Sequence, residues 1–400
     1  MSHQRIFALP RWSAVLAALA AGLVLAGCGS GTTSAISSTA GSGDAGSWAS
    51  TLKAAHGETL RFWMYGGDDK VNAYIDRDVR PALARLGVTL QRVPIGDTAD
   101  AVKRVVAERR AGKTTGGGVD LIWINGENFA TGKQAGLWLR DWSTSLPNFK
   151  RFVNPHDPSI ASDFKVPVDG QEAPWWRAAF VYAYDSAKVS DPPRDFDALR
   201  AWAKAHPGRF TYPAPPDYTG SSFVRQVVAA KGADAAFAYL KELKPFMYRR
   251  GTVFPKSQAE LEQLFGDGQV DFAMAYDANI VNADVRKGLF PESTRPLVIG
   301  DGALVNVSFV TIPANAAHAA AAKVAANLLL DPRLQARKAD PTVLGNPTVL
   351  DSARLGPARA LFARSQASPY VLRDLGTPVT EFAAAEVAPL ERRWTREVLR

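Results

Sequence analysis

The chain has 400 residues, of which 46% are hydrophobic and 22% are charged, and its formal net charge at pH 7 is +8. This length predicts two domains or one large domain, with enough apolar surface to fold unaided. A single cysteine excludes a disulfide framework and multi-thiolate metal sites, and the five histidines include no i, i+4 pair for a zinc helix. The positive charge alone would favour nucleic acid as a partner.

The first residues predict export. Arg5 and Arg11 form a basic region without acids, and an apolar run of 12 residues follows over 14–25. A membrane-spanning helix needs about 20 apolar residues, so residues 1–27 are interpreted as a secretory signal peptide. The run ends in Leu-Ala-Gly before Cys28, which resembles the bacterial lipobox, where the cut precedes a lipidated cysteine. An ordinary signal peptide with an accidental cysteine is the alternative.

A tether is expected over residues 28–50. The segment is almost entirely Gly, Ser, Thr and Ala, a composition that cannot bury a core. Loss of the signal peptide removes two arginines and lowers the charge from +8 to about +6. An exported chain meets no nucleic acid, so we interpret this charge as solvated surface. The expected location is the extracytoplasmic face of a bacterial membrane, with a lipid anchor at Cys28.

From residue 51 onward, strand and helix patterns alternate. Strands are predicted over 59–65, 88–93 and 119–124, with helices over 71–83 and 98–110 between them. This order is typical of an α/β layer structure with a mostly parallel sheet.

The middle and the end of the chain continue the alternation. The predicted strands are 178–184, 209–212, 270–276 and 303–312, and the predicted helices are 196–205, 222–231 and 314–330. Residues 351–400 are predicted to form helices with charged faces.

Candidate site residues follow or flank the predicted strands, because ligands of open α/β sheets bind beyond the carboxyl ends of the strands. They share aromatic, carboxylate, amide, hydroxyl or glycine chemistry. They are Tyr65, Gly66, Asp68, Asn125, Glu127, Asn128, Trp175, Trp176, Asp217, Tyr218, Thr219, Ser221, Tyr276, Asp277, Asn279 and Asn306.

Simpler structural roles compete with ligand binding at these positions. Tryptophan and tyrosine at strand ends also serve as core or lid residues. Residues 217–222 form either a turn with a helix N-cap or a set of free N–H and hydroxyl groups for a ligand. Asp68 at a helix start is also explained by the helix dipole.

Catalysis is not expected. The chain has no G-x-S-x-G motif and no second thiol, and no histidine lies in these loops to activate a serine. Aromatic faces, carboxylates and amides without a nucleophile and base fit binding better than turnover. No cofactor and no metal are expected.

Three segments carry a family resemblance. They are 123–129 (WINGENF), 212–223 (YPAPPDYTGSSF) and 330–340 (LDPRLQARKAD). Together with the lipobox and the tether, they resemble an extracytoplasmic solute-binding protein of an ABC importer. The first two are similar to the YnjB-like branch, relatives of thiamine-, polyamine- and ferric-binding proteins.

The resemblance implies a type II periplasmic-binding fold with two α/β lobes. The first lobe is expected over 51–181 plus 306–400 and the second over 182–305, with hinge strands 178–184 and 303–312. It also implies a monomer that captures a small solute by lobe closure and delivers it to an ABC permease and its ATPase.

The ligand class stays open at the sequence level. Aromatic and acidic residues favour a cationic or zwitterionic, thiamine- or polyamine-like solute. A carbohydrate or a phosphate-bearing solute is the alternative within the same fold. An anchored extracytoplasmic hydrolase or lyase, or a structural lipoprotein, is the alternative from another class. Iron is disfavoured because Ala183 separates Tyr182 from Tyr184 and no histidine lies near them.

Overall fold

The computed structural model describes residues 48–367, 372, 375–377 and 379–400. The predicted signal peptide, Cys28 and residues 28–47 of the predicted tether therefore lie outside the described residues. Helix α1 (Trp48–Ala55) begins inside the segment predicted as a tether, so regular structure starts earlier than expected.

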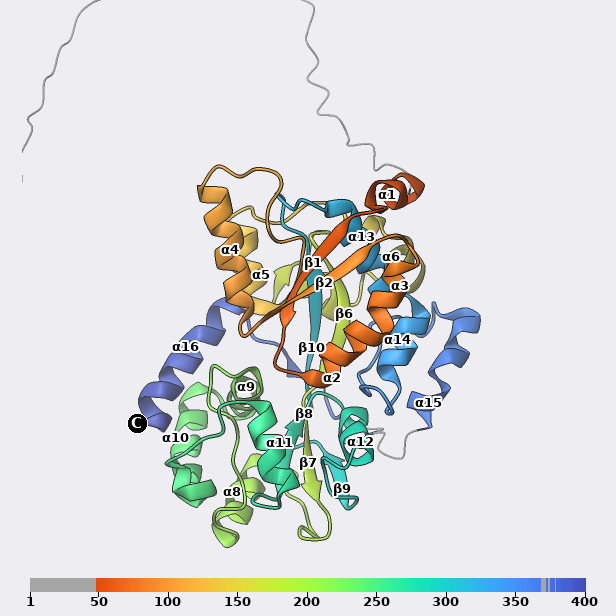
Figure 1. Cartoon of the computed structure of the whole chain (residues 1–400). Coiled ribbons are helices and arrows are strands. Elements are labelled where there is room, and N and C mark those ends of the chain that lie inside the picture. The colour runs from red at the N-terminus through yellow and green to blue at the C-terminus, as the bar shows by residue number, and fades with distance from the viewer. Residues whose placement is uncertain (1–47, 368–371, 373–374, 378) are drawn as a thin grey trace, which may run out of the picture. The chain divides into compact units, whose positions relative to one another are not determined.

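The first lobe is built on a mixed sheet in the order β11-β10-β3-β1-β2, with β6 also paired to β10 (Figure 1). Strands β1, β2 and β3 are parallel, whereas β10 runs antiparallel to β3 and β6. The bounds are β1 Thr59–Tyr65, β2 Thr89–Ile95, β3 Leu121–Ile124, β6 Glu172–Ala179, β10 Leu304–Thr311 and β11 Val379–Thr380.

Helices flank this sheet, and the longer ones bury apolar residues against it. The helix predicted over 71–83 is confirmed as a continuous run of three segments, and the helix over 98–110 has the predicted bounds. The helices are α2 Asp69–Tyr74, η1 Ile75–Val79, α3 Arg80–Ala84, α4 Thr98–Arg110, α5 Gly126–Gln134, η2 Ser143–Ser145, α6 Pro147–Phe152, α7 Pro158–Ala161, α13 Ala319–Leu329, α14 Pro332–Ala339, η5 Gly356–Phe362 and α15 Ala363–Gln366. A short hairpin pairs β4 (Ser162–Asp163) with β5 (Val166–Pro167).

The second lobe contains a three-stranded antiparallel sheet in the order β8-β7-β9. The prediction of a mostly parallel sheet is therefore wrong for this lobe. Its strands are β7 Val181–Asp185, β8 Phe272–Ala275 and β9 Thr294–Leu297. Its helices are α8 Phe196–Ala205, α9 Tyr218–Lys231, α10 Ala233–Leu243, η3 Lys244–Phe246, η4 Tyr248–Gly251, α11 Gln258–Gly266 and α12 Ala278–Arg286.

The strand predicted over 209–212 is wrong. Phe210 and Tyr212 are fully buried, which explains the strand-like composition. Their segment nevertheless forms only scattered backbone hydrogen bonds, such as Tyr248 N–H to the Phe210 carbonyl and Asp271 N–H to the Arg209 carbonyl. Burial of alternate aromatic residues therefore occurs here without a strand ladder.

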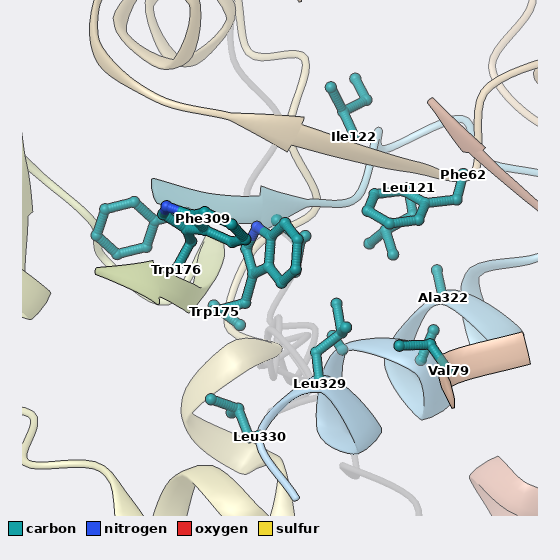
Figure 2. Packing of buried hydrophobic residues seen from close by; sticks show 14 of the residues in the cluster. Phe62, Val79, Leu121, Ile122, Trp175, Trp176, Phe309, Ala322, Leu329 and Leu330 are labelled. Carbon is teal, nitrogen blue, oxygen red and sulfur yellow. The ribbon is translucent and has the colours of Figure 1, made fainter. Parts of the chain in front are cut away.

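Each lobe has its own hydrophobic core. The first core joins residues between 55 and 176 to residues between 307 and 362. Trp175 packs there above the helix that carries Leu329, as Figure 2 shows. The second core joins residues between 180 and 304 to the end of the chain.

Among the described residues, three segments connect the two lobes. The chain leaves the first lobe between β6 and β7, where Phe180 interrupts the predicted strand 178–184 and donates its N–H to the Leu304 carbonyl. It returns along β10. The last helices, α16 (Ala384–Trp394) and η6 (Thr395–Leu399), place Trp394 and Val398 in the second core. The boundaries of the two lobes remain a prediction. Residues 306–400 were expected in the first lobe, but Trp394 and Val398 pack in the core of the second.

Candidate functional site

Helix α9 brings an aromatic side chain of the second lobe onto strand β10. The amide Nδ2 of Asn306 donates a hydrogen bond to the hydroxyl of Tyr218. The rings of Tyr218 and Tyr276 lie 5.6 Å apart, and the hydroxyls of Tyr276 and Thr219 are hydrogen-bonded to each other. Four predicted site residues therefore lie together where the lobes meet.

The loop after β3 reaches the same strand from the first lobe. Ser308 shares the face of β10 with Asn306 because alternate strand residues point the same way. The amide Nδ2 of Asn125 donates a long hydrogen bond of 3.4 Å to the Ser308 hydroxyl. We call the following set the junction site: Asn125, Tyr218, Thr219, Tyr276, Asn306 and Ser308.

The three predicted aspartates of the site all serve as N-caps. Asp68, Asp217 and Asp277 each accept a hydrogen bond from a backbone N–H in the first turn of the following helix, at 2.8, 2.9 and 2.7 Å. Asp217 also accepts the next N–H of α9, at 3.1 Å. The alternative in which these N–H groups are free for a ligand is therefore wrong for the first turn of α9.

Behind Tyr218 lies a buried ionic network. Arg225, on α9, is 1% exposed, and its Nε donates to Glu381 at 2.7 Å. The guanidinium also lies 5.4 Å from the ring centroid of Tyr218 and donates to the hydroxyl of Ser221. The Ser221 hydroxyl in turn donates to Glu391 on α16 at 2.6 Å. The predicted site residue Ser221 thus faces this network, which supports the ring of Tyr218.

Two adjacent tryptophans have different positions. A β-bulge in β6 places Trp176 opposite Ser308, while the next residue of β10 pairs with Pro174. Trp175, the extra residue, is fully buried in the first core (Figure 2). Its ring lies 4.8 Å from that of Trp123. Trp176 is 9% exposed and is paired across the sheet with Ser308 of the junction site. Trp175 can therefore only support the site from the core.

The remaining predicted residues lie on the loops around the junction site. Tyr65 is 40% exposed, and the backbone N–H of Gly66 is hydrogen-bonded to the Ile95 carbonyl. Exposed Glu127 and half-buried Asn128 occupy the first turn of α5, and half-buried Asn279 occupies the first turn of α12. None of these side chains is hydrogen-bonded to the junction site, so their ligand contacts remain predictions.

The surroundings of the site are acidic. Loss of hydration raises the pKa of Asp217 and Glu127, and raises that of Asp277 to about 7. Burial, together with repulsion from Asp217, Asp68 and Glu262, raises the pKa of the Tyr65 hydroxyl. Burial is therefore the main cause of these shifts, and Asp217 also acts electrostatically on the Tyr276 hydroxyl of the junction site.

Lys338 near the end of α14 was missed by the sequence reasoning. It is fully buried, and its Nζ donates to the Pro347 carbonyl at 2.8 Å and to Asn346 Oδ1. The ammonium lies 5.2 Å from the ring centroid of Trp176. Burial lowers the pKa of Lys338 well below its usual value, Arg177 lowers it further, and Asp277 opposes that change. No local sequence pattern distinguishes this lysine from the exposed basic residues of the same helix.

Two features are absent from the described residues. Within them, no group of three or more histidine, cysteine or acidic side chains is arranged to hold a metal ion. No helix in the described part of the chain has the length and apolar character needed to cross a membrane.

The comparisons with known proteins agree with this architecture. The family model described as bacterial extracellular solute-binding protein matches residues 81–364. The chain belongs to this family of binding proteins, which serves ABC transporters in the periplasm. It is 38% identical over 368 residues to protein YnjB of Escherichia coli (strain K12), covering 88% of this chain and 93% of that protein.

Solved periplasmic binding proteins share the fold. AfuA of Actinobacillus pleuropneumoniae, with fructose-6-phosphate bound, matches with a TM-score of 0.63 and 13% identity, over 85% of this chain and 98% of that chain. Iron-bound HitA of Pseudomonas aeruginosa matches with a TM-score of 0.61 and 17% identity, over 84% of this chain and 98% of that chain. A periplasmic thiamin binding protein matches with a TM-score of 0.58 and 16% identity, over 86% of this chain and 96% of that chain. These likenesses confirm the expected two-lobed α/β binding-protein fold.

Proposed function

We propose that this protein is a monomeric, lipid-anchored solute receptor that captures a small cationic or zwitterionic organic molecule between its lobes. A thiamine- or polyamine-like solute fits this description. The lobes close around the solute and deliver it to an ABC permease and its ATPase, and no bond of the solute is made or broken.

One observation carries the choice of ligand class. The rings of Tyr218 and Tyr276 lie 5.6 Å apart at the lobe junction, and Asp217, whose pKa is raised by burial, acts electrostatically on the Tyr276 hydroxyl. Aromatic faces attract organic cations through the ring quadrupole, and a desolvated carboxylate adds Coulombic attraction. A bound cation would offset part of the cost of burying the Asp217 carboxylate.

A second candidate is a carbohydrate or phosphate-bearing solute. It is favoured by buried Lys338, which has only neutral oxygen acceptors and lies near Arg177. AfuA, which shares the fold, has fructose-6-phosphate bound. An anionic group of a zwitterion would suit the same cation.

The direct test is a thermal-shift screen of the full chain against thiamine, spermidine, amino acids, glucose and glucose-6-phosphate. A binding solute raises the melting temperature saturably, because it binds the native state only. Thiamine or spermidine is the expected hit. Stabilisation by glucose-6-phosphate alone would replace this ligand class with the second candidate, and a new product after incubation would favour an enzyme.

Two variants sharpen the screen. Glu127→Gln should weaken binding of a cation, whereas Glu242→Gln, an exposed control on α10, should leave it unchanged. Equal affinity of both variants would contradict a role for Glu127.

The lipid anchor has a separate test. Cells supplied with radiolabelled palmitate should incorporate label into the full chain, and Cys28→Ser should abolish this incorporation. Equal labelling of both forms would overturn the proposed anchor.

A further inference from the structure

Lys70 forms ion pairs with two carboxylates that belong to the other lobe. Its Nζ lies 2.9 Å from Asp284 Oδ1 on α12 and 3.6 Å from Glu262 Oε2 on α11. The exposed fraction of the side chain is 22% for Lys70, 1% for Asp284 and 14% for Glu262. Figure 1 shows α2, α11 and α12 along the line where the lobes meet.

Each end of this contact is fixed to a different core. Val71 and Tyr74, beside Lys70, are buried in the first core. Leu261, next to Glu262, is buried in the second core, as is Val281 on α12. Separation of the lobes therefore requires that both ion pairs break.

The cluster contains one ammonium group and two carboxylates. The lysine is therefore essential, because the two carboxylates repel each other without it. Burial raises the pKa of Glu262 to about 7 and also raises that of Asp284. The other charged groups that influence the cluster are Asp68 on α2 and Lys287 on α12. Without Lys70, two desolvated carboxylates would face each other, and the second oxygen of Asp284 already lacks a hydrogen-bond partner.

Solvent can reach this cluster. Lys70 borders a cavity of about 310 Å³ that is also lined by Lys287 of the second lobe and Val343 of the first. Protons can therefore exchange with the carboxylates while the lobes remain in contact.

We propose that Lys70 is a positioning residue that holds the two lobes together by bridging Glu262 and Asp284, and so sets solute affinity without touching the solute. The affinity part of this inference rests on the proposed function, whereas the contact between the lobes is measurable without any solute.

The test is small-angle X-ray scattering of the full chain without solute, at pH 8 and at pH 5.5. Lys70→Met should increase the radius of gyration at pH 8, because the unpaired carboxylates repel. At pH 5.5 the carboxylates take up protons and the increase should disappear. Lys70→Arg should resemble the wild type at both values of pH. Lys103→Met, which breaks an exposed pair within the first lobe, is the matched control.

A neutral cluster provides a second check. Lys70→Met combined with Glu262→Gln and Asp284→Asn removes all three charges and should restore the wild-type radius at pH 8. For a solute found in the screen, Lys70→Met should bind about 5- to 100-fold more weakly at pH 8, within the usual range of coupling between sites.

Two results would overturn the inference. One is a radius of Lys70→Met equal to that of the Lys103→Met control at pH 8. The other is an increase that neither acid nor the neutral triple variant reverses, since that indicates local damage instead of charge pairing. Failure of every solute in the screen would contradict the proposed function but would leave the scattering result intact.

Discussion

The Nδ2 amide of Asn306 donates a hydrogen bond to the hydroxyl of Tyr218, and this bond joins strand β10 to the first turn of α9. Because β10 contributes to the first core and α9 to the second, the pair fixes a tyrosine ring of the proposed ligand site at the boundary between the lobes.

Loss of this bond should have a measurable cost. Tyr218→Phe and Asn306→Ala should each lower the free energy of unfolding by about 1 kcal/mol, the usual net value of one hydrogen bond. The double variant should cost less than the sum of the two, with a coupling of about 0.5–1.5 kcal/mol. Urea unfolding measures all three variants, and strictly additive effects would show that the residues do not interact in solution.

Gly220 is predicted to be indispensable for the position of α9. A Cβ at this position would lie 1.9 Å from the Pro213 carbonyl oxygen, which is backbone and cannot rotate away. Gly220→Ala should therefore displace the first turn of α9, reduce stability by about 1–3 kcal/mol and weaken solute binding. Gly96→Ala is the control, since nothing lies within 4 Å of its Cβ. Similar melting temperatures for the two variants would contradict this prediction.

Stability should fall as pH rises from about 4.5 to above 7. The folded-state pKa values of Glu262 and Asp277 are raised to about 7 by burial, so the folded protein holds these protons more tightly than the unfolded chain does. The stabilisation from these two protons is complete below the unfolded pKa values and is lost as pH passes through 7. Each group contributes at most about 1–3 kcal/mol to the free energy of unfolding.

The measurement is urea unfolding at several values of pH. Glu262→Gln and Asp277→Asn, which imitate the protonated forms, should each reduce the loss between pH 5 and pH 8. Below about pH 4 the sign reverses, because carboxyls such as Asp76 and Asp340 have lowered pKa values and lose their ion pairs. A wild-type stability that rises between pH 5 and pH 8 would be the contradictory outcome.

The contributions of Arg225 and Glu381 to the free energy of unfolding should depend on each other. Arg225→Met leaves a buried carboxylate without its partner and should cost about 3–5 kcal/mol, whereas Arg225→Met with Glu381→Met should cost clearly less. Unfolding by urea again provides the comparison. If the double variant is less stable than the single one, the pair contributes net stability by itself.

Local signals predicted the first lobe well. Asp97 caps α4, whose bounds agree with the prediction, and β1 likewise spans 59–65 as expected. Both elements have strong periodicity and clear end residues. Segment 209–212 has similar strand-like chemistry, but its backbone has no partner strand, and pairing is a tertiary property that composition does not contain.

The site was predicted in part for the same reason. Tyr276 follows from the rule about strand ends and Asn306 from its position on a hinge strand, whereas the prediction of Tyr218 rests on a strand over 209–212 that does not form. Lys338 and Arg225 become significant only because distant segments enclose them, and their own sequence neighbourhoods give no sign of burial. Prediction from sequence therefore identified the loops around the site better than the charges behind it.

Trp394 is fully buried in the second core and donates a hydrogen bond to the Tyr212 hydroxyl. The second lobe therefore cannot complete its folding before residue 394 has been synthesised, and the first lobe must also wait for residues near 360. Domains usually fold one after another from the N-terminus during translation. The two lobes cannot fold in this order, because each needs a segment from late in the chain. Both lobes therefore stay incomplete until their C-terminal segments have been made.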